Sequence, residues 1–384
     1  MQDGPGRRLQ RTTRRSSIAI RRGMLYFIAM HRLVRFLASV AAAGDLAAQP
    51  VRADPVDKIV EAQMAEHHVP GVALTIIQDG RRIRTSAYGF ANLEWKVRVT
   101  PDTVFEIGSI TKQFTAACIL LLEQEGRLSV DDPVGKYLPD APSSWSRITL
   151  RHLLNHTSGI RSYTGQEGFE LARHLTQAQF VQKAGAWPLE FEPGAKYAYC
   201  NTGFNLLGYI IENVGGTNYW AFLSSRILVP AGMKDTADRN PKNLIPRRAS
   251  GYELGGDGRM VNRDSDITDV FSAGAMASTI GDLAVWNGVL DTDKVLSNAS
   301  KKKMWSPTVL NDGTVHAYSF AWWLDPVEGH QRVGHTGETS GFNASFERFP
   351  DDRLCIIVLS NSGESERADT IARAIAPLYF KSRL

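Results

Sequence analysis

Cysteine is scarce in this chain, and no apolar run is long enough to cross a membrane. The three cysteines, Cys118, Cys200 and Cys355, lie far apart among 384 residues and form no C-x-x-C pair. An odd, scattered set disfavours a disulfide framework and a zinc ribbon. No apolar stretch reaches the ~18 uninterrupted residues of a membrane-spanning helix, so we expect none in the mature protein. Internal repeats, which would indicate a solenoid or a propeller, are also missing.

Basic residues outnumber acidic ones only in the N-terminal tail. The whole chain carries a formal net charge of +4. Residues 1–53 contain ten arginines and two aspartates, which leaves 34 basic and 38 acidic residues in residues 54–384. The body is therefore slightly acidic, which disfavours a nucleic-acid partner. Its length allows a large core or two domains of ordinary size.

The tail has the features of an export signal. A short apolar stretch over Phe36–Ala43 follows Arg32 and Arg35, and small residues lead to Val51-Arg52-Ala53. This pattern is typical of a secretory signal peptide. We therefore expect residues 1–53 to form a basic tail and signal peptide, and the body to be periplasmic or secreted. A disordered tail on a cytoplasmic protein is the alternative.

Strand patterns stand near both ends of the body. A helix over Val56–His67 is followed by an apolar strand over Gly71–Ile77, the turn Asp79-Gly80 and a second strand over Arg82–Tyr88, which together predict a hairpin. Near the other end, strands and a closing helix are predicted over Val315–Leu324, Gln331–His335, Gly341–Phe349, Arg353–Asn361 and Ser365–Lys381, with a tight turn at Asp351-Asp352. The stretch between them is mostly helical, over Ser109–Gly126, Thr149–Asn155, Thr176–Ala184, Asn201–Val214, Tyr219–Leu228, Thr279–Leu290 and Asn298–Trp305.

This order predicts an α/β (α+β) fold with one mainly antiparallel sheet, flanked by the terminal helices, and an inserted all-helical domain. The sheet subdomain is expected to comprise about 54–96 and 306–384, and the helical subdomain about 97–305. A cleft between two such parts is a common place for a small-molecule site.

The first motif with chemical potential is Ser109-Ile-Thr-Lys112. The almost wholly apolar run Gln113–Leu122 follows it, which indicates a buried helix with Ser109 at its N-terminus, where backbone N–H groups favour developing negative charge. Lys112 lies one turn on, and an amine in a dry site can take a hydroxyl proton. Ser109 as a simple helix cap is the alternative. Ser300-Lys-Lys-Lys303 also matches S-x-x-K, but we expect its lysine run to be solvated.

The second motif is Tyr199-Cys-Asn201, which follows a Pro-Gly turn and opens a predicted helix. The phenol of Tyr199 could relay protons if a neighbouring positive charge lowered its pKa. The alternative has Asn201 as helix N-cap and Tyr199 as a packing residue. Cys200 is expected to be a small buried filler.

The third motif is Gly334-His335-Thr336-Gly337 at the end of a predicted strand, where glycine allows close backbone approach. Such a strand edge could hold a substrate's backbone, with His335 and Thr336 addressing its polar end. A turn with a partly exposed histidine is the alternative.

Two further pairs of residues are open to more than one interpretation. His152 and His156 are spaced i, i+4, but they lack a glutamate between them and a third ligand nearby, which disfavours a metal site. Trp322 and Trp323 are expected to face opposite sides of a strand.

The three motifs, in this order, resemble those of the penicillin-recognising serine hydrolases of the β-lactamase-like family. That family includes class C β-lactamases, D-alanyl-D-alanine carboxypeptidases, D-aminopeptidases and β-lactamase-like esterases. The resemblance covers essentially Pro55–Phe380 and includes the flanking stretches Phe105–Thr115, His152–Gly159 and Pro193–Tyr197. It implies a β-lactamase/transpeptidase-like fold, in agreement with the predicted layout.

The resemblance also implies roles. Ser109 would be the acylated nucleophile, with Lys112 and Tyr199 as the pair that handles protons. Asn201 would hydrogen-bond the amide or ester side chain of the substrate. His335 and Thr336, followed by Gly337, would engage its polar end. The backbone N–H groups of Ser109 and Glu338 would form the oxyanion hole.

These roles predict a serine hydrolase that cleaves an ester or amide bond through a covalent acyl-enzyme, as an esterase or D-peptidase, without a metal or an organic cofactor. A D-alanyl-D-alanine carboxypeptidase or class C-type β-lactamase is the alternative within the class, and a non-catalytic relative that binds a wall fragment or a partner is the alternative outside it. Many β-lactamases have lysine where this chain has His335. Because histidine is largely uncharged near neutral pH, it is a poorer partner for a substrate carboxylate.

Overall fold

The computed structural model describes residues 54–166, 175–363 and 367–381. The chain divides after Asp54 into two units, and the second, Pro55–Leu384, contains every helix and strand described below. The export signal predicted over residues 1–53 lies outside the described residues. Within the described ranges, no helix combines the length and the apolar character that a membrane span requires.

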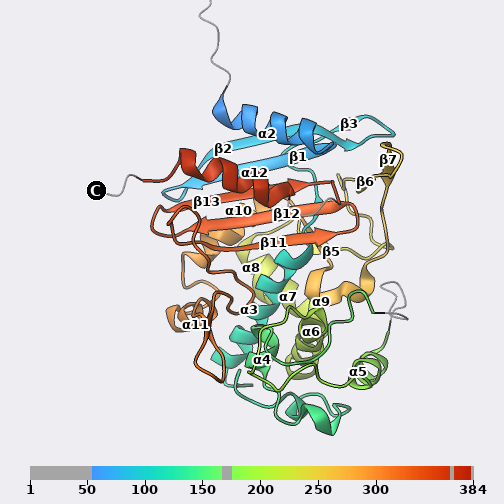
Figure 1. Cartoon of the computed structure of the whole chain (residues 1–384), viewed down its shortest axis with the longest axis vertical. Helices are drawn as coiled ribbons and strands as arrows, with labels where there is room; N and C mark the ends of the chain where they lie inside the picture. Colours follow the sequence, from blue (N-terminus) through green and yellow to red (C-terminus); the bar gives the residue numbers. More distant parts are fainter. Residues whose placement is uncertain (1–53, 167–174, 364–366, 382–384) are drawn as a thin grey trace, which may run out of the picture. The chain divides into compact units, whose positions relative to one another are not determined.

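The central feature is an antiparallel sheet of six strands in the order β11-β12-β13-β1-β2-β3 (Figure 1). β1 pairs with β13, so strands from the two ends of the body meet in the middle of the sheet. This pairing confirms the predicted antiparallel sheet. The strands are β1 (Gly71–Gln78), β2 (Arg81–Asn92), β3 (Val97–Arg98), β11 (Val333–Thr339), β12 (Phe342–Phe349) and β13 (Leu354–Ser360).

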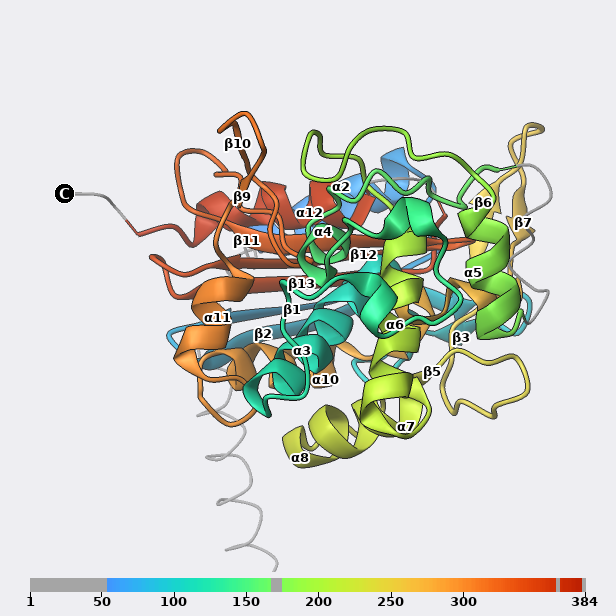
Figure 2. The same cartoon turned by 90° about the horizontal axis from the view of Figure 1, so that it is seen from below.

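Helices cover both faces of the sheet, and the two terminal helices share one face (Figure 1). Three helices contact the sheet directly, namely α2 (Pro55–Glu66), α12 (Arg367–Ile375) and α10 (Ile280–Leu290). Two more, α3 (Thr111–Gln124) and α6 (Asn201–Gly215), form the next layer together with the turn that carries Ser109. Figure 2 shows α3 and α6 next to each other on the side of the sheet away from α2 and α12.

The alternation of side chains along β1 explains this layering. Val72, Leu74 and Ile76 are buried against α2 and α12, whereas Ala73 and Ile77 belong to the larger core on the other face. Because successive residues of a strand point to opposite faces, a continuous apolar run such as this one needs cover on both sides.

The remaining short elements are α4 (Leu150–Leu154), α5 (Gln177–Gly185), α7 (Tyr219–Leu223), α8 (Val229–Ala231), α9 (Phe271–Gly274), α11 (Asn298–Met304), β4 (Phe105–Glu106), β5 (Ala237–Asp238), β6 (Tyr252–Leu254), β7 (Met260–Asn262), β8 (Met276–Ser278), β9 (Thr308–Val309) and β10 (Val315–His316). The assignment of about 97–305 to a separate helical subdomain stays a prediction.

The first hairpin forms where the sequence predicts it. β1 and β2 pair with Gln78 opposite Arg81. The two turn residues, Asp79 and Gly80, both have positive φ, 51° and 76°. Two consecutive positive φ angles are the geometry of a type I′ turn, whose twist matches that of the strands.

The strand predicted over Val315–Leu324 is wrong beyond its first two residues. The strand β10 ends at His316, and Ala321 has a φ of 68°, which reverses the chain. The backbone N–H of Ser319 closes this reversal by donating to the carbonyl of Trp322, at 2.8 Å. A non-glycine residue with positive φ leaves no mark in a hydrophobicity pattern.

The closing helix is also shorter than the predicted Ser365–Lys381. The α-helix ends at Ile375 and continues only as a 3-10 turn over Ala376–Leu378. Pro377 lacks a backbone N–H and its ring conflicts with the preceding helical turn, so an α-helix cannot continue through it. The helix predicted over Tyr219–Leu228 likewise stops being α-helical at Leu223 and becomes a π-helical segment.

A buried ion pair joins Arg332, the residue before β11, to Glu347 on the neighbouring strand β12. The side chains of Arg332 and Glu347 are 2% and 1% exposed. Arg332 Nη2 donates to Glu347 Oε1 at 2.9 Å, and its Nη1 donates to Asp325 at 2.5 Å. Removing one partner of such a pair leaves a charge in a medium that solvates it poorly.

We therefore expect Glu347→Gln to lower the free energy of unfolding by about 3 kcal/mol, because Arg332 would keep its charge without its main partner. Urea denaturation measures this change. Arg147→Gln is the matched control, since the side chains of the Arg147–Glu192 pair are 73% and 67% exposed. An exposed pair contributes less than about 1 kcal/mol. Equal losses in the two variants would contradict the prediction.

Candidate active site

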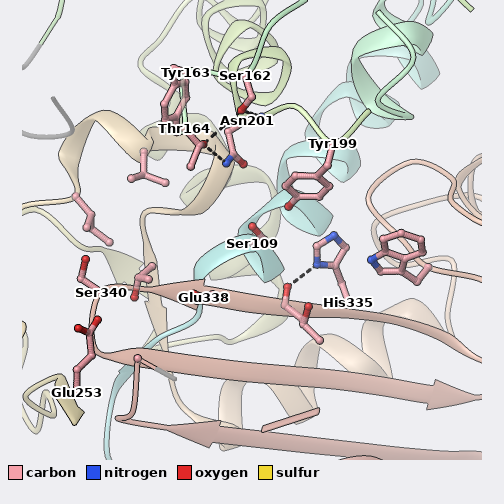
Figure 3. Close-up of a pocket in the computed structure, with 16 residues that line it drawn as sticks. Ser109, Ser162, Tyr163, Thr164, Tyr199, Asn201, Glu253, His335, Glu338 and Ser340 are labelled. Atoms are coloured by element: carbon pink, nitrogen blue, oxygen red, sulfur yellow. Dashed lines mark hydrogen bonds between the residues drawn. The ribbon is translucent and has the colours of Figure 1, made fainter. Parts of the chain in front are cut away.

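The three sequence motifs converge on one pocket with a volume of about 710 Å³ (Figure 3). The side chains of Ser109, Tyr199 and His335 point into it together. The pocket is also lined by Thr164, Asn201, Glu253, Ile267, Val270, Trp323, Thr336 and Glu338. Every predicted side chain of the site lines this pocket except that of Lys112, which lies beneath Ser109 and contacts it.

Ser109 lies in a single 3-10 turn, Gly108–Ile110, that leads directly into α3. The N-cap residues of the turn and of the helix are Ile107 and Ile110, and neither cap has a side-chain hydrogen bond. The interpretation of Ser109 as a helix cap is therefore wrong. Its hydroxyl oxygen instead contacts the amine of Lys112, with Oγ and Nζ 2.8 Å apart.

The amine of Lys112 is completely buried and has three polar neighbours. They are Ser109 Oγ at 2.8 Å, Asn201 Oδ1 at 2.7 Å and the carbonyl oxygen of Ala273 at 2.7 Å. A neutral amine has two N–H groups and one lone pair. As an ammonium, Lys112 donates to all three neighbours. In the neutral form, Asn201 Oδ1 and the Ala273 carbonyl, which can only accept, take the two N–H groups, and the lone pair is left for the Ser109 hydroxyl.

Burial makes this neutral form accessible. Loss of solvation lowers the pKa of Lys112 well below the ordinary lysine value. A neutral amine whose lone pair faces a serine hydroxyl is the arrangement of a general base beside a nucleophile. The contact between Lys112 and Ser109 therefore suits Ser109 to attack an electrophilic carbonyl carbon.

Tyr199 does not have the lowered pKa that a relay base would need. Burial raises the pKa of its phenol, and the hydrogen bond with Ser109 opposes this rise only in part. The Lys112 amine lies 4.8 Å from the centre of the Tyr199 ring, but in its neutral form it provides no positive charge to stabilise a phenolate. The condition stated for a proton relay, a pKa lowered by a neighbouring charge, is not met, and Tyr199 is suited to donate a proton as a neutral phenol.

Asn201 begins helix α6 but does not cap it. The N-cap residue is Cys200, whose Sγ accepts from the backbone N–H of Gly203 at 3.4 Å. The Asn201 side chain is free of that task. Its Oδ1 accepts from Lys112, and its Nδ2 donates to Thr164 Oγ1 at 2.7 Å. Cys200 is buried, as predicted.

The third motif packs its backbone directly on the nucleophile turn. A Cβ on Gly337 would lie 1.9 Å from the carbonyl oxygen of Ile107 and 3.1 Å from the backbone nitrogen of Ser109. A Cβ on Gly108 would lie 2.4 Å from the backbone nitrogen of Glu338. Only glycine fits at either position, and this contact brings together the backbones of Ser109 and Glu338, the two donors of the predicted oxyanion hole.

Glu106 holds the same strand in place, and sequence reasoning missed it. Its carboxylate is buried beside Arg239, whose Nε donates to Oε1 at 2.5 Å. Its Oε2 accepts from Thr339 Oγ1 at 2.8 Å. The hydroxyl comes from the residue after Glu338, so Glu106 ties β4 to the end of β11.

The segment that supplies the Ala273 carbonyl was also missed. Asn205 on α6 holds it with both amide atoms: Nδ2 donates to the carbonyl of Asp269 at 2.8 Å, and Oδ1 accepts from the N–H of Ala273 at 3.3 Å. The only mark of this role in the sequence is that Asn205 follows the Tyr-x-Asn motif by one helical turn.

His335 is buried, with 2% of its surface exposed, so the interpretation as a partly exposed histidine is wrong. Its Nδ1 lies 2.5 Å from the carbonyl oxygen of Thr336 (Figure 3), and its Nε2 lies 3.0 Å from the hydroxyl of Tyr318. Burial is the main cause that lowers the pKa of His335, to about 3, and the charged form of Lys112 contributes to this lowering. At neutral pH this position carries no charge.

The two histidines of the i, i+4 pair have separate structural tasks. His152 closes the capping box of α4, where its Nδ1 accepts from the N–H of Thr149 at 3.2 Å. His156 is buried, and its Nδ1 accepts from the N–H of Cys200 at 3.1 Å. In the part of the chain that the structure describes, no group of three or more His, Cys, Asp and Glu side chains is placed to hold a metal ion.

The adjacent tryptophans separate as predicted. Trp322 is completely buried and packs edge-to-face on Phe346, with ring centres 6.0 Å apart. Trp323 lines the pocket.

The second S-x-x-K match does not build a site. Lys303 pairs with Glu123 at 2.8 Å, and Ser300 donates to Gln124 at 2.6 Å. The lysine run is not fully solvated, contrary to expectation. Lys301 is 6% exposed, and its Nζ donates to the carbonyl of Thr292 at 2.8 Å.

Lys112→Arg is expected to slow the reaction of Ser109 with a fluorophosphonate by at least about 100-fold, because a guanidinium stays charged and cannot accept the hydroxyl proton. In the wild type the rate should fall as the pH is lowered through the depressed pKa of Lys112. Lys303→Arg is the control, because it keeps its ion pair with Glu123. Fast labelling of Lys112→Arg would show that another group is the base.

Known proteins share this sequence and this arrangement. Penicillin-binding protein 4* of Bacillus subtilis (strain 168) is 31% identical over 336 residues, which cover 82% of this chain and 73% of that protein. A second curated relative is also 31% identical, and the chain spans 62% of its length.

Solved structures agree with these relatives. The octameric penicillin-binding protein homologue from Pyrococcus abyssi has a TM-score of 0.74 and 29% identity, over 84% of this chain and 76% of that one. The D-amino acid amidase from Ochrobactrum anthropi SV3, complexed with L-phenylalanine amide, has a TM-score of 0.72 and 27% identity, over 84% of this chain and 97% of that one. The Beta-lactamase family model matches residues 56–379. The chain therefore belongs to the Beta-lactamase family of serine hydrolases and has the β-lactamase/transpeptidase-like fold.

Proposed function

We propose that this protein hydrolyses ester or amide bonds through a covalent acyl-enzyme on Ser109, as an esterase or peptidase. The observation that carries the proposal is the contact of 2.8 Å between Ser109 Oγ and a fully buried Lys112 amine. A lysine is expensive to bury, and here the amine lies against the hydroxyl of a serine that lines a pocket. This arrangement favours catalysis over the alternative of a non-catalytic binding relative.

In the acylation step, Ser109 Oγ attacks the carbonyl carbon while the Lys112 amine takes the hydroxyl proton. The backbone N–H groups of Ser109 and Glu338 hold the negative charge on the carbonyl oxygen. The tetrahedral intermediate then collapses and its bond to the leaving nitrogen or oxygen breaks. The Tyr199 phenol donates a proton to the leaving group, and the proton on Lys112 replaces it. Water attacks the acyl-enzyme by the reverse route and releases the acid.

The charge of the pocket favours substrates without a carboxylate at the third motif. Among the described lining residues, Glu253 and Glu338 are acidic and none is a lysine or an arginine. His335 is neutral, because its pKa is lowered to about 3. A penicillin or a D-alanyl-D-alanine end would bring a carboxylate with no cation to meet it, whereas a neutral ester or an amino acid amide would not. The similarity to a D-amino acid amidase supports the same substrate class.

The alternative within the class is a D-alanyl-D-alanine carboxypeptidase or a class C-type β-lactamase. The similarity to penicillin-binding proteins favours it. Those activities use the same nucleophile, so they differ from the main proposal only in what the pocket accepts.

Acylation of Ser109 is tested with a fluorophosphonate and a fluorescent penicillin, followed by mass spectrometry of the labelled peptide. We expect an adduct on Ser109 that is absent from Ser109→Ala, because that variant lacks the attacking oxygen. Ser300→Ala, in the second S-x-x-K match, is the control and should label normally. An adduct that persists in Ser109→Ala would refute the assignment.

The substrate class is tested by comparing kcat/KM for p-nitrophenyl butyrate, a D-amino acid amide and nitrocefin. We expect the two substrates without a carboxylate to exceed nitrocefin at least tenfold, since tenfold corresponds to about 1.4 kcal/mol of lost carboxylate recognition. If nitrocefin is the best substrate by a wide margin, the alternative activity is correct.

A further inference from the structure

A chain of hydrogen bonds runs behind the pocket and joins the second motif to the third. The backbone N–H of Cys200 donates to His156 Nδ1 at 3.1 Å, and His156 Nε2 lies 3.1 Å from the Tyr318 hydroxyl. That hydroxyl lies 3.0 Å from His335 Nε2, and His335 Nδ1 lies 2.5 Å from the carbonyl of Thr336. The three side chains are at most 2% exposed.

The two ends of the chain fix the position of every proton in it. The Cys200 N–H can only donate, so His156 Nδ1 is unprotonated and its neutral ring carries the proton on Nε2, which donates to the Tyr318 oxygen. The Thr336 carbonyl can only accept, so His335 carries its proton on Nδ1. His335 Nε2 is then the acceptor for the Tyr318 hydroxyl proton. Each link has one donor and one acceptor.

An additional proton does not fit into this chain. A proton on His335 Nε2 would face the O–H of Tyr318, whose oxygen already accepts from His156. The surroundings act in the same direction: burial is the largest cause that lowers the pKa of both histidines, a protonated Lys112 adds to it, and smaller contributions come from His335 on His156 and from Arg332 on His335. Tyr199, whose ring centre is 6.2 Å from that of His335, is a neutral phenol.

We propose that Tyr318, oriented by His156, is a positioning residue that occupies Nε2 of His335 and, together with the Thr336 carbonyl at Nδ1, holds His335 as its neutral Nδ1–H tautomer. The substrate then meets the ring of His335 only as an uncharged surface, and the neighbouring Thr336 side chain is polar and also lines the pocket. His156 and Tyr318 thereby determine specificity, because they keep the third motif from acting as an anion-binding group. The kinetic part of this inference rests on the proposed function, whereas the tautomer does not.

Tyr197 provides a matched control for Tyr318. The ring of Tyr197 lies 5.5 Å from that of Tyr318 and stacks on His316 at 3.9 Å. Within the described residues, the Tyr197 hydroxyl is buried without a hydrogen-bond partner. Tyr197→Phe and Tyr318→Phe therefore remove the same atom from neighbouring rings, but only the second removes a link of the chain.

The tautomer is tested by NMR of protein labelled with ¹⁵N-histidine, with His156→Gln and His335→Gln used to assign the two rings. At neutral pH we expect His335 protonated on Nδ1 only and His156 on Nε2 only. A charged ring, or the opposite tautomer in His335, would overturn the proposal. This readout needs no turnover, so it stands even if the proposed hydrolysis fails.

The specificity role is tested by kcat/KM for p-nitrophenyl butyrate and nitrocefin in the two tyrosine variants, with thermal unfolding as a check of the fold. In Tyr318→Phe, His335 Nε2 is free to be protonated and to bind a carboxylate. We therefore expect the ratio of nitrocefin to ester activity to rise at least threefold, and more at acidic pH. Tyr197→Phe should leave the ratio unchanged. If Tyr318→Phe lowers both activities equally, Tyr318 supports the fold only and the specificity role is refuted.

Discussion

A lysine amine that is cut off from water must find its hydrogen-bond partners inside the protein, and the active site is built to supply them to Lys112. The partners come from three segments far apart in the sequence: Ser109 one turn earlier, Asn201 at the start of α6, and Ala273 in the short helix α9. Each of these segments must be fixed for the amine to stay neutral. Asn205 holds the segment that contains Ala273, and the buried helix α3 carries Lys112. Both therefore support the chemistry as much as the residues that line the pocket do.

Burial away from water also determines the protonation states of the other ionisable side chains around the pocket. Burial keeps His335 neutral and Tyr199 protonated, so the described side chains closest to Ser109 present hydrogen bonds and no fixed charge. The buried charges lie one layer further out, where Glu106 meets Arg239 and Arg332 meets Glu347. These pairs fix the strand that carries the third motif. The ion pairs that hold the pocket in shape thus lie behind the side chains of Tyr199 and His335.

Much of this arrangement can be predicted from the residues, and the rest cannot for physical reasons. Local signals are sufficient for the Asp79-Gly80 hairpin, for the apolar strands at both ends and for the position of Ser109 just before a buried helix. The reversal at Ala321, the burial of Lys301 and the bond between Glu106 and Thr339 depend on contacts between distant segments. The hydrophobic periodicity of the sequence and the spacing of its motifs do not reveal such contacts. The direction of the Tyr199 pKa shift also cannot be read from the sequence, since it depends on how deeply the ring is buried.

The pairing of β1 with β13 has a consequence for how the protein is made. β1 is among the first parts of the body to leave the ribosome, but its partner strand is separated from it by more than the whole helical region. The contact therefore closes a very long loop, a feature that slows folding. Until β13 has been synthesised, one edge of β1 has no native partner strand, and α12, which helps to cover one face of the sheet, is also missing. The nascent chain should accordingly depend on holding factors during synthesis, and its sheet should complete as one of the last steps.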